Sequence, residues 1–317
     1  MERPEENCCA VFCRRTTRDV LRNRRKGVQN MSAEEAFSHT LSKSVIDQFS
    51  ADGFVATAGV FSATELERFG IAVDDEVRQR TAHDLRKVEA KSTYEQSFVQ
   101  CMRLWETNDL VRDFVCDGRL ASMAAQLLKV PSVRLWQDQA LFKEAGGRET
   151  DPHQDQTFWP IGSAPLVSVW IPFDAVTRDN GAMAYVPGSH LVGGLRPVDI
   201  THTTKPYDIL NDAKLTERTP RWMEVQAGEM IWHHGFTIHQ AAANTSNATR
   251  RVFTVVFIAD GCTRTNAWPT FPLDRDQVGV GDAIAGDGMP VLWPKPSEPP
   301  KVPEQRGVLL GVQSRVL

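Results

Sequence analysis

Residues 252–259, Val-Phe-Thr-Val-Val-Phe-Ile-Ala, decide the fold because they form the longest apolar stretch of the chain. The stretch carries no charge and is rich in β-branched and aromatic residues, which is typical of a strand buried on both faces. It is far shorter than the roughly 18 apolar residues that span a bilayer. Similar short runs, bounded by Gly, Pro and Asn, occur at residues 133–142, 166–173, 182–186 and 229–233. We therefore predict an all-β core in this half of the chain.

The sequence before this core has helical spacing. The stretches 32–35 and 62–65 each place a Ser three residues before a Glu, which matches a capping box at the start of a helix. Apolar residues recur at helical spacing across residues 109–128 and predict a helix there. Residues 53–57 predict one short strand. We expect a mainly helical front at about residues 31–130.

The order of these elements indicates the architecture. Short strands with helices in front and a long insertion near residues 195–222 favour a mainly β fold with flanking helices, a double-sheet jelly roll, over a βαβ array. We expect one domain at residues 31–317, with the β core at about 131–260 and a C-terminal extension at about 261–317. Residues 1–30 are rich in arginine and poor in apolar residues, so we expect a mobile tail.

Charge and cysteine content exclude several classes of partner. The chain has 36 Lys+Arg against 40 Asp+Glu, a net charge of −4, so we expect no binding of nucleic acid by a general electrostatic field. The six cysteines show no CxxC spacing, which argues against a zinc ribbon or a disulfide scaffold. Without a transmembrane stretch or the apolar segment of a secretory signal, we expect a cytoplasmic protein with no membrane partner. The sequence does not indicate the oligomeric state.

The first cluster that suggests chemistry is Asp151-Pro152-His153-Gln154-Asp155. If these residues continue a strand, His153 and Asp155 point the same way. An imidazole and a carboxylate on one face can take adjacent positions around one metal ion, and a third ligand would complete a 2-His-1-carboxylate triad. The pattern also arises often by chance, so it needs support from elsewhere in the chain.

The second cluster offers three histidines for the third ligand: His233, His234 and His239. Only one is needed, and the other two are expected to be hydrogen-bonded or solvated. Arg250 follows at the mouth of the apolar run, where a guanidinium needs an anionic partner. Two interpretations stay open for it: a structural salt bridge to an Asp or Glu, or a dicarboxylate co-substrate held bidentately.

These pieces together resemble a known family. The order of His-x-Asp, a distal His239 and an Arg eleven residues later is similar to the phytanoyl-CoA dioxygenase family of iron- and 2-oxoglutarate-dependent oxygenases. The segments 52–55, 180–183 and 186–190 also resemble signature segments of that family. The resemblance covers about residues 43–260 and implies a double-stranded β-helix core of the jelly-roll or cupin type.

The resemblance also implies roles for single residues. His153, Asp155 and His239 would be the Fe(II) ligands at the catalytic centre, and Arg250 would bind the remote carboxylate of 2-oxoglutarate. The other co-substrate contacts that it suggests are Gln139 and Trp170. With three protein ligands, the metal keeps positions for 2-oxoglutarate and for O2. The expected reaction hydroxylates a C–H bond of a small organic substrate and releases succinate and CO2.

Two positions bear on this expectation. Halogenases that resemble the family have Gly or Ala in place of the carboxylate, so Asp155 favours hydroxylation. The family usually has a Ser two residues after the distal His, whereas this chain has Ala241, which removes a hydroxyl contact worth about 0.5–1.5 kcal/mol. Aromatic residues next to the ligand segments are candidates for the substrate pocket: Phe158, Trp159 and Trp232.

The substrate is not readable from the sequence. No basic cluster near the motifs supports an acyl-CoA. Two other functions stay open: a catalytically inactive small-molecule binding protein of the same fold, and a cupin-like metal hydrolase or isomerase that uses the same ligands. Arg250 separates the last from a dioxygenase, because a hydrolase has no need of it.

Overall fold

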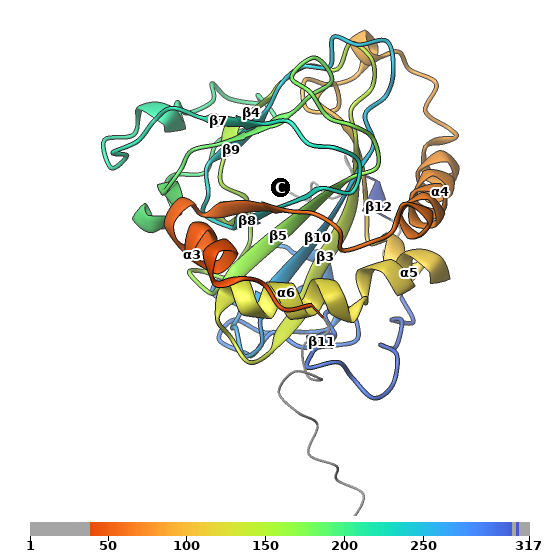
Figure 1. Cartoon of the computed structure of the whole chain (residues 1–317), viewed down its shortest axis with the longest axis vertical. Helices are drawn as coiled ribbons and strands as arrows, with labels where there is room; N and C mark the ends of the chain where they lie inside the picture. The colour runs from red at the N-terminus through yellow and green to blue at the C-terminus, as the bar shows by residue number, and fades with distance from the viewer. Residues whose placement is uncertain (1–38, 306–308, 311–317) are drawn as a thin grey trace, which may run out of the picture. The chain divides into compact units, whose positions relative to one another are not determined.

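Two antiparallel sheets form the core of the chain within the residues that this computed structural model describes, 39–305 and 309–310 (Figure 1). The larger sheet has the order β1-β8-β5-β10-β3-β2-β12, and β11 also pairs with β3. The smaller sheet has the order β4-β9-β6-β7. The strands are β1 (Phe54–Thr57), β2 (Val99–Met102), β3 (Val133–Phe142), β4 (Thr150–His153), β5 (Leu166–Pro172), β6 (Met183–Tyr185), β7 (Arg221–Met223), β8 (Met230–His234), β9 (His239–Ala241), β10 (Val252–Ala259), β11 (Val291–Trp293) and β12 (Leu309–Leu310).

Helices cover one face of the larger sheet. Figure 1 shows α6 lying across its strands, and Leu120 and Leu127 of α6 share a buried core with Phe253 of β10. The predicted fold, mainly β with flanking helices and a jelly-roll core, is confirmed. The helices are α3 (Lys43–Asp52), α4 (Ala63–Thr81), α5 (Asp109–Val115), α6 (Gly118–Leu128) and α7 (Phe271–Arg275), with short 3-10 helices η1 (Val88–Ala90), η2 (Leu104–Glu106), η3 (Asp155–Phe158), η4 (Ser189–Val192) and η5 (Ile209–Asn211).

The central strand β10 explains why its sequence lacks a polar face. Phe253 and Val255 pack with the helices, whereas Val256 and Ile258 belong to a core on the opposite face. Because side chains alternate along a strand, both faces of β10 must be apolar. It pairs with β5 on one side and with β3 on the other, so neither of its edges is exposed. The strand predicted at residues 252–259 is confirmed.

The helix predicted across residues 109–128 is wrong in one respect, because it is two helices. α5 ends at Val115, and α6 begins after Asp117, whose side chain accepts a hydrogen bond from Arg119 N at 2.8 Å. An Asp is a strong N-cap because its carboxylate satisfies a free backbone N–H in the first turn. The apolar spacing continues across the break, so periodicity alone did not reveal it.

Gly53 joins α3 to β1 and shows why the segment 52–55 needs a glycine. Its φ is +81°, a left-handed conformation that ends the helix. A Cβ at this position would lie 2.4 Å from His190 Nδ1 and 2.5 Å from Thr237 Oγ1. Only glycine therefore allows the start of β1 to approach these two loops beside the smaller sheet.

Other expectations concern the front of the chain. The expected tail at residues 1–30 and the capping box at residues 32–35 lie outside the described residues. The box at residues 62–65 is confirmed, because Glu65 N donates to Ser62 Oγ at 3.2 Å and Ser62 N donates to Glu65 Oε2 at 2.8 Å. Among the residues that the structure describes, no helix is both long and apolar enough to cross a membrane.

Candidate metal centre

Three side chains converge at one end of the smaller sheet. His153 is the last residue of β4 and His239 is the first residue of β9, and the two are paired in the antiparallel register. Asp155 opens η3 directly after β4. Asp155 Oδ1 lies 3.4 Å from His153 Nε2 and 3.5 Å from His239 Nε2. One ligand atom from each residue lies within 4.8 Å of the others, which suits a single metal ion.

The route by which Asp155 reaches this centre differs from the expectation. The strand ends at His153, so the two side chains are not neighbours on one strand face. The turn is held instead by Gln154, whose Nε2 donates to Phe236 O at 2.7 Å and whose Oε1 accepts from Leu195 N at 2.8 Å. This buried amide links three distant segments and directs the carboxylate toward the imidazoles. No local pattern in the sequence indicates this role of Gln154, because its partners are remote in the chain.

Backbone carbonyls orient the two imidazoles as ligands. Asp151 O lies 2.7 Å from His153 Nδ1, and Thr237 O lies 3.0 Å from His239 Nδ1. A carbonyl only accepts a hydrogen bond, so each Nδ1 carries a proton and each Nε2 faces Asp155. Such outer contacts fix the tautomer and orientation of metal-binding histidines. Two imidazoles and one carboxylate form the donor set of non-haem Fe(II) sites.

His233 holds the second oxygen of Asp155. It lies on β8, on the sheet face toward the smaller sheet, and its Nε2 is 3.2 Å from Asp155 Oδ2. Burial lowers the pKa of His233 to about 4, so the ring is neutral and donates through Nε2. Burial alone would raise the pKa of Asp155, but the charge of His239 and hydrogen bonds from three histidines hold it well below its usual range.

The third candidate, His234, faces away from this centre. Its Nδ1 accepts from Phe236 N at 3.1 Å, and its ring centroid is 5.3 Å from that of His190. The structure therefore brings His239 to the metal centre, places His233 behind Asp155 and directs His234 to a neighbouring loop. Alternation along β8 explains why adjacent histidines have different surroundings.

Arg250 is a buried cation without an ion-pair partner among the described residues. It is 3% exposed, and its Nε and Nη1 have no hydrogen-bond partner among the described residues. Its guanidinium carbon lies 5.3 Å from the centroid of the Trp170 ring. The salt bridge that was one interpretation of Arg250 occurs at its neighbour: Arg251 pairs with Asp74 and Asp174, both at 2.6 Å. Burial lowers the pKa of Arg250 to about 10, so it stays charged at neutral pH.

The metal centre and Arg250 line one cavity of about 960 Å³. Gln139 and Trp170 line it as well, and so do Phe158 and Trp159. Trp232 does not, which corrects its expected pocket role: it alternates to the helix-covered face of β8, and its Nε1 donates to Thr57 Oγ1 at 2.9 Å. Part of the insertion near residues 195–222 also lines the cavity.

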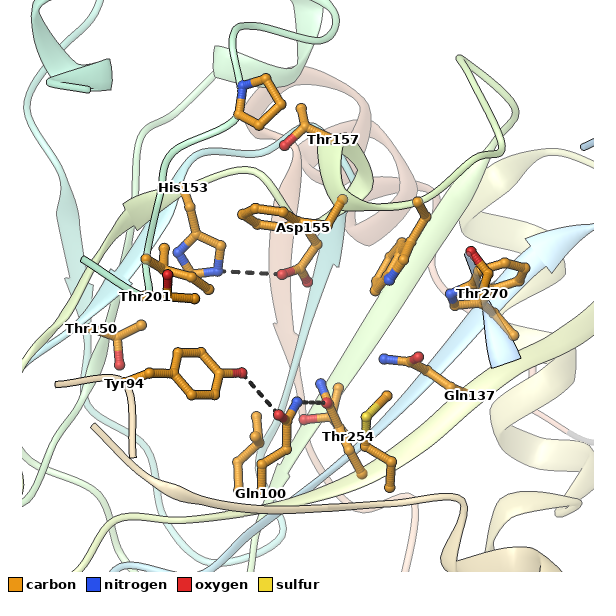
Figure 2. A pocket seen from close by; sticks show the side chains of 18 of the residues that line it. Tyr94, Gln100, Gln137, Thr150, His153, Asp155, Thr157, Thr201, Thr254 and Thr270 are labelled. Carbon is orange, nitrogen blue, oxygen red and sulfur yellow. Dashed lines mark hydrogen bonds and ion pairs between the residues drawn. The ribbon is translucent and has the colours of Figure 1, made fainter. Parts of the chain in front are cut away.

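Neutral polar side chains that were not singled out complete the wall. Tyr94 Oη donates to Gln100 Oε1 at 2.8 Å, as Figure 2 shows, and Gln100 Nε2 donates in turn to Gln139 Oε1 at 2.7 Å. Gln137 and Thr254 also face the cavity. The period of two along β3 links Gln137 to Gln139, so the alternation was a usable signal. Tyr94 and Gln100 come from a distant segment and gave no such signal.

Comparison with known proteins agrees with this geometry. A family model described as phytanoyl-CoA dioxygenase matches residues 49–252. A phytanoyl-CoA dioxygenase domain-containing protein 1 of Danio rerio is 35% identical over 133 residues, which are 37% of this chain and 42% of that protein. A probable alpha-ketoglutarate-dependent hypophosphite dioxygenase of Stutzerimonas stutzeri is 26% identical over 80% of this chain and 84% of its own length.

Solved structures show the same fold. The non-heme alpha ketoglutarate dependent carbocyclase SnoK from nogalamycin biosynthesis superposes with a TM-score of 0.66 at 24% identity, covering 80% of this chain and 96% of that one. The first curated relatives, by contrast, are aligned over 42%, 57% and 56% of their own lengths, so this chain spans about half of them.

Proposed function

The chain belongs to the phytanoyl-CoA dioxygenase family, and on that premise we propose that it is an Fe(II)- and 2-oxoglutarate-dependent dioxygenase that hydroxylates a C–H bond of a small organic substrate. Succinate and CO2 would be the co-products. The observation that carries the proposal is the presence, in one cavity, of a three-ligand metal centre and a buried arginine that has no ion-pair partner in the part of the chain that the structure describes.

His153, Asp155 and His239 are the residues that would hold Fe(II), which leaves three of six coordination positions open. When bound, the metal supplies the activation of dioxygen, with 2-oxoglutarate as the electron donor. The contact of His233 with Asp155 Oδ2 leaves Oδ1 directed at the two imidazoles. His233 is thus a positioning residue, since it fixes the carboxylate without being one of the three ligands.

Arg250 would bind the remote carboxylate of 2-oxoglutarate. Its free Nε and Nη1 match a planar, bidentate acceptor, and the Trp170 ring beside it excludes water from the pair. Thr254 Oγ1 also lacks a partner and lines the same cavity, so it can donate a further hydrogen bond. Ala241 lines the cavity where the family usually has a serine, which leaves one hydroxyl contact unmade.

Hydroxylation is the reaction that the intact ligand set supports best. Asp155 fills the position that halogenases resembling the family leave to a halide. The solved structures of SnoK, a carbocyclase, and SnoN, an epimerase, belong to the same fold at 24% and 22% identity, so the fold by itself does not fix the product. Product mass distinguishes these reactions, because hydroxylation adds an oxygen atom, whereas epimerisation does not change the mass.

The first test is a spectroscopic titration without oxygen. Protein loaded with Fe(II) should develop a weak visible charge-transfer band as 2-oxoglutarate is added, and His153→Ala should abolish it. The matched control is His234→Ala, which removes an imidazole from the same region and should keep the band, because His234 contacts Phe236 and His190 instead.

Each outcome separates one function from another. Bound iron without the band would contradict the dioxygenase and favour a metal hydrolase or isomerase. No bound iron would favour an inactive binding protein. A band followed by 2-oxoglutarate decay on admission of oxygen supports the dioxygenase, and persistence of that decay in His153→Ala would overturn the ligand assignment.

A further inference from the structure

We propose that the substrate of this site is an uncharged molecule built on rings, with hydrogen-bonding oxygens at its edge, and that coenzyme A thioesters and small oxyanions are not substrates. The inference rests on the proposed function, since it concerns the same cavity. It is carried by three observations: the pairing of charged groups that line the cavity, the aromatic walls, and an amide that has no protein partner.

No free cation is available for an anionic substrate among the described residues that line the cavity. They include no lysine. Arg250 is engaged by the co-substrate under the proposed function. Arg103 and Arg275 both pair with Glu106, at 2.6 Å and 3.0 Å, and Arg275 Nε also contacts Asp276 at 3.0 Å. Apart from Arg250, a polyphosphate group therefore finds no lining arginine or lysine without an internal ion pair, although Arg275 Nη2 has no hydrogen-bond partner among the described residues.

The carboxylates of Asp274 and Asp199, which line the cavity, also have partners within the chain. Asp274 Oδ1 lies 2.8 Å from Arg264 Nη1. Asp199 accepts hydrogen bonds within its own loop, from Thr201 Oγ1 at 2.6 Å and Thr203 Oγ1 at 2.7 Å. Asp274 is therefore paired with a cation, and Asp199 directs both oxygens to hydroxyl and backbone N–H groups of its own loop. An uncharged molecule can enter this cavity without leaving a buried charge unpaired.

Aromatic rings supply much of the remaining wall. The rings of Tyr94 and Phe98 are 5.2 Å apart, and those of Trp136 and Trp159 are 5.9 Å apart. Phe158 lies beside the metal centre, with its ring 6.0 Å from that of His153. Flat aromatic surfaces favour ligands that stack or pack edge to face.

A polar group without a protein partner faces the same space. Gln137 is 7% exposed, and its side chain makes no hydrogen bond to any described residue. Figure 2 shows it pointing into the cavity opposite His153 and Asp155. A buried amide is costly unless a ligand or water satisfies it, so its placement predicts a hydroxyl or carbonyl on the substrate. An amide binds such groups without requiring a charge.

The size of the cavity points the same way. Its volume of about 960 Å³ is at the upper end of the range of roughly 300–1,000 Å³ that is typical of sites for drug-sized ligands. 2-Oxoglutarate takes only a small part of such a space. A phosphorus oxyanion would leave most of the aromatic wall in contact with water, whereas a molecule of two or more rings would fill it.

The experiment is a binding titration by quenching of tryptophan fluorescence, with and without Fe(II) and 2-oxoglutarate, under anaerobic conditions. The uncharged probes are a dihydroxyanthraquinone, a methoxyflavone and an androstanediol. The charged probes are the carboxylated analogue of the same anthraquinone, octanoyl-CoA and hypophosphite. We expect at least one uncharged ring to bind, and the carboxylated analogue to bind about tenfold more weakly than its parent, since an unpaired carboxylate would be buried.

Two results would overturn the proposal: octanoyl-CoA or hypophosphite binding more tightly than every uncharged ring, or none of the uncharged rings binding. These results leave the charge-transfer titration untouched, so failure of the substrate class and failure of the proposed function are separate. A normal band with stimulation of 2-oxoglutarate decay by octanoyl-CoA would preserve the dioxygenase and remove the substrate class.

A variant tests the role of the amide. Gln137→Leu should weaken binding of the oxygenated rings by about 2- to 10-fold, which corresponds to one neutral hydrogen bond, and should leave binding of anthracene unchanged. The matched control is Gln226→Leu, which makes the same change at an exposed position outside the cavity. Equal loss for anthracene and for the oxygenated rings would show that packing, not hydrogen bonding, had changed. That result would overturn the amide's role.

Discussion

Two buried arginine sites line the same cavity and differ in how their charge is neutralised. In one site, Arg103 and Arg275 flank Glu106 in a network whose charges are internal to the chain. In the other site, Arg250 has free Nε and Nη1 atoms and no carboxylate at ion-pair distance among the described residues. The cations of the first arrangement have internal carboxylate partners, although Arg275 Nη2 has no hydrogen-bond partner, whereas the described residues supply no carboxylate to the second.

The two sites show how a structural charge, which has a partner within the chain, differs from a binding charge, which needs a ligand. Burying a cation without a partner destabilises the fold, because the cation loses its hydration. Arg250 carries such a cost, so an anion that enters the cavity gains what the fold does not supply. The Glu106 network has no such deficit, and we expect it to contribute to stability and not to ligand binding. The predictions below test this division.

The largest effect should come from removing the shared anion of the structural network. Glu106→Ala would leave Arg103 and Arg275 buried without it, and breaking a buried pair typically costs about 3–5 kcal/mol. The free energy of unfolding from urea titration should fall by that amount, and 2-oxoglutarate affinity of the remaining folded protein should not change. A loss below 1 kcal/mol would mean that the network is not structural.

The second effect concerns Arg250. Arg250→Ala should weaken 2-oxoglutarate binding about 100-fold, as expected when one partner of a buried charge pair is removed, and should leave stability unchanged or raised. The measurement is the shift of the charge-transfer titration, with urea unfolding alongside. The control is Arg251→Ala, because the adjacent arginine pairs with Asp74 and Asp174 and should not affect the titration. Equal shifts of the 2-oxoglutarate titration in the two variants would contradict the separate roles of Arg250 and Arg251.

The pH dependence of stability tests the surroundings of the structural network. Burial raises the pKa of the Asp138 carboxyl, near Arg103, to about 7, compared with about 3.9 in the unfolded chain. Between these values the folded chain keeps a proton that the unfolded chain releases, so the free energy of unfolding should fall as pH rises from about 4 to 7. Leu104 N and Trp105 N donate to Oδ2, while Oδ1 has no partner.

Asp138→Asn removes this titration and keeps an acceptor for both backbone donors. Above pH 7 it should be more stable than the parent chain by roughly 2 kcal/mol, because no unpaired charge is buried. Urea unfolding at several pH values measures the difference between the two proteins. Parallel stability curves across this window would show that Asp138 is ionised in the folded chain throughout.

The sequence predicts best what depends on neighbouring residues. The strand at 252–259 and the capping box at 62–65 follow from local composition, and both are confirmed. The break at Asp117 and the turn at Gln154 were not foreseen, because side-chain hydrogen bonds decide them and, at Gln154, the partners are remote in the chain. Sequence offered both a salt bridge and a ligand for Arg250, since the positions of Asp74 and Asp174 depend on tertiary packing.

The same limit applies to the cavity. His153 and His239 are far apart in sequence, and only the family resemblance linked them before their pairing in the β4–β9 register was known. Trp232 was misplaced because adjacency to a ligand segment does not fix a side chain's direction, whereas the alternation of β8 does. Gln137 shares its alternation with Gln139, yet its importance depends on the absence of a partner, which no local pattern reveals.

The smallest effect should come from Ala241, the position where the chain departs from its family. Ala241 lines the cavity and is buried, so Ala241→Ser would add one hydroxyl there without adding charge. We expect 2-oxoglutarate to bind about 2- to 10-fold more tightly, the equivalent of 0.5–1.5 kcal/mol for a neutral hydrogen bond. In the Arg250→Ala background the gain should shrink, because a co-substrate that is no longer anchored does not hold its carboxylate near the new hydroxyl. An equal gain in both backgrounds would mean that the hydroxyl acts independently of the arginine, and that the binding charge and the missing hydroxyl belong to different subsites.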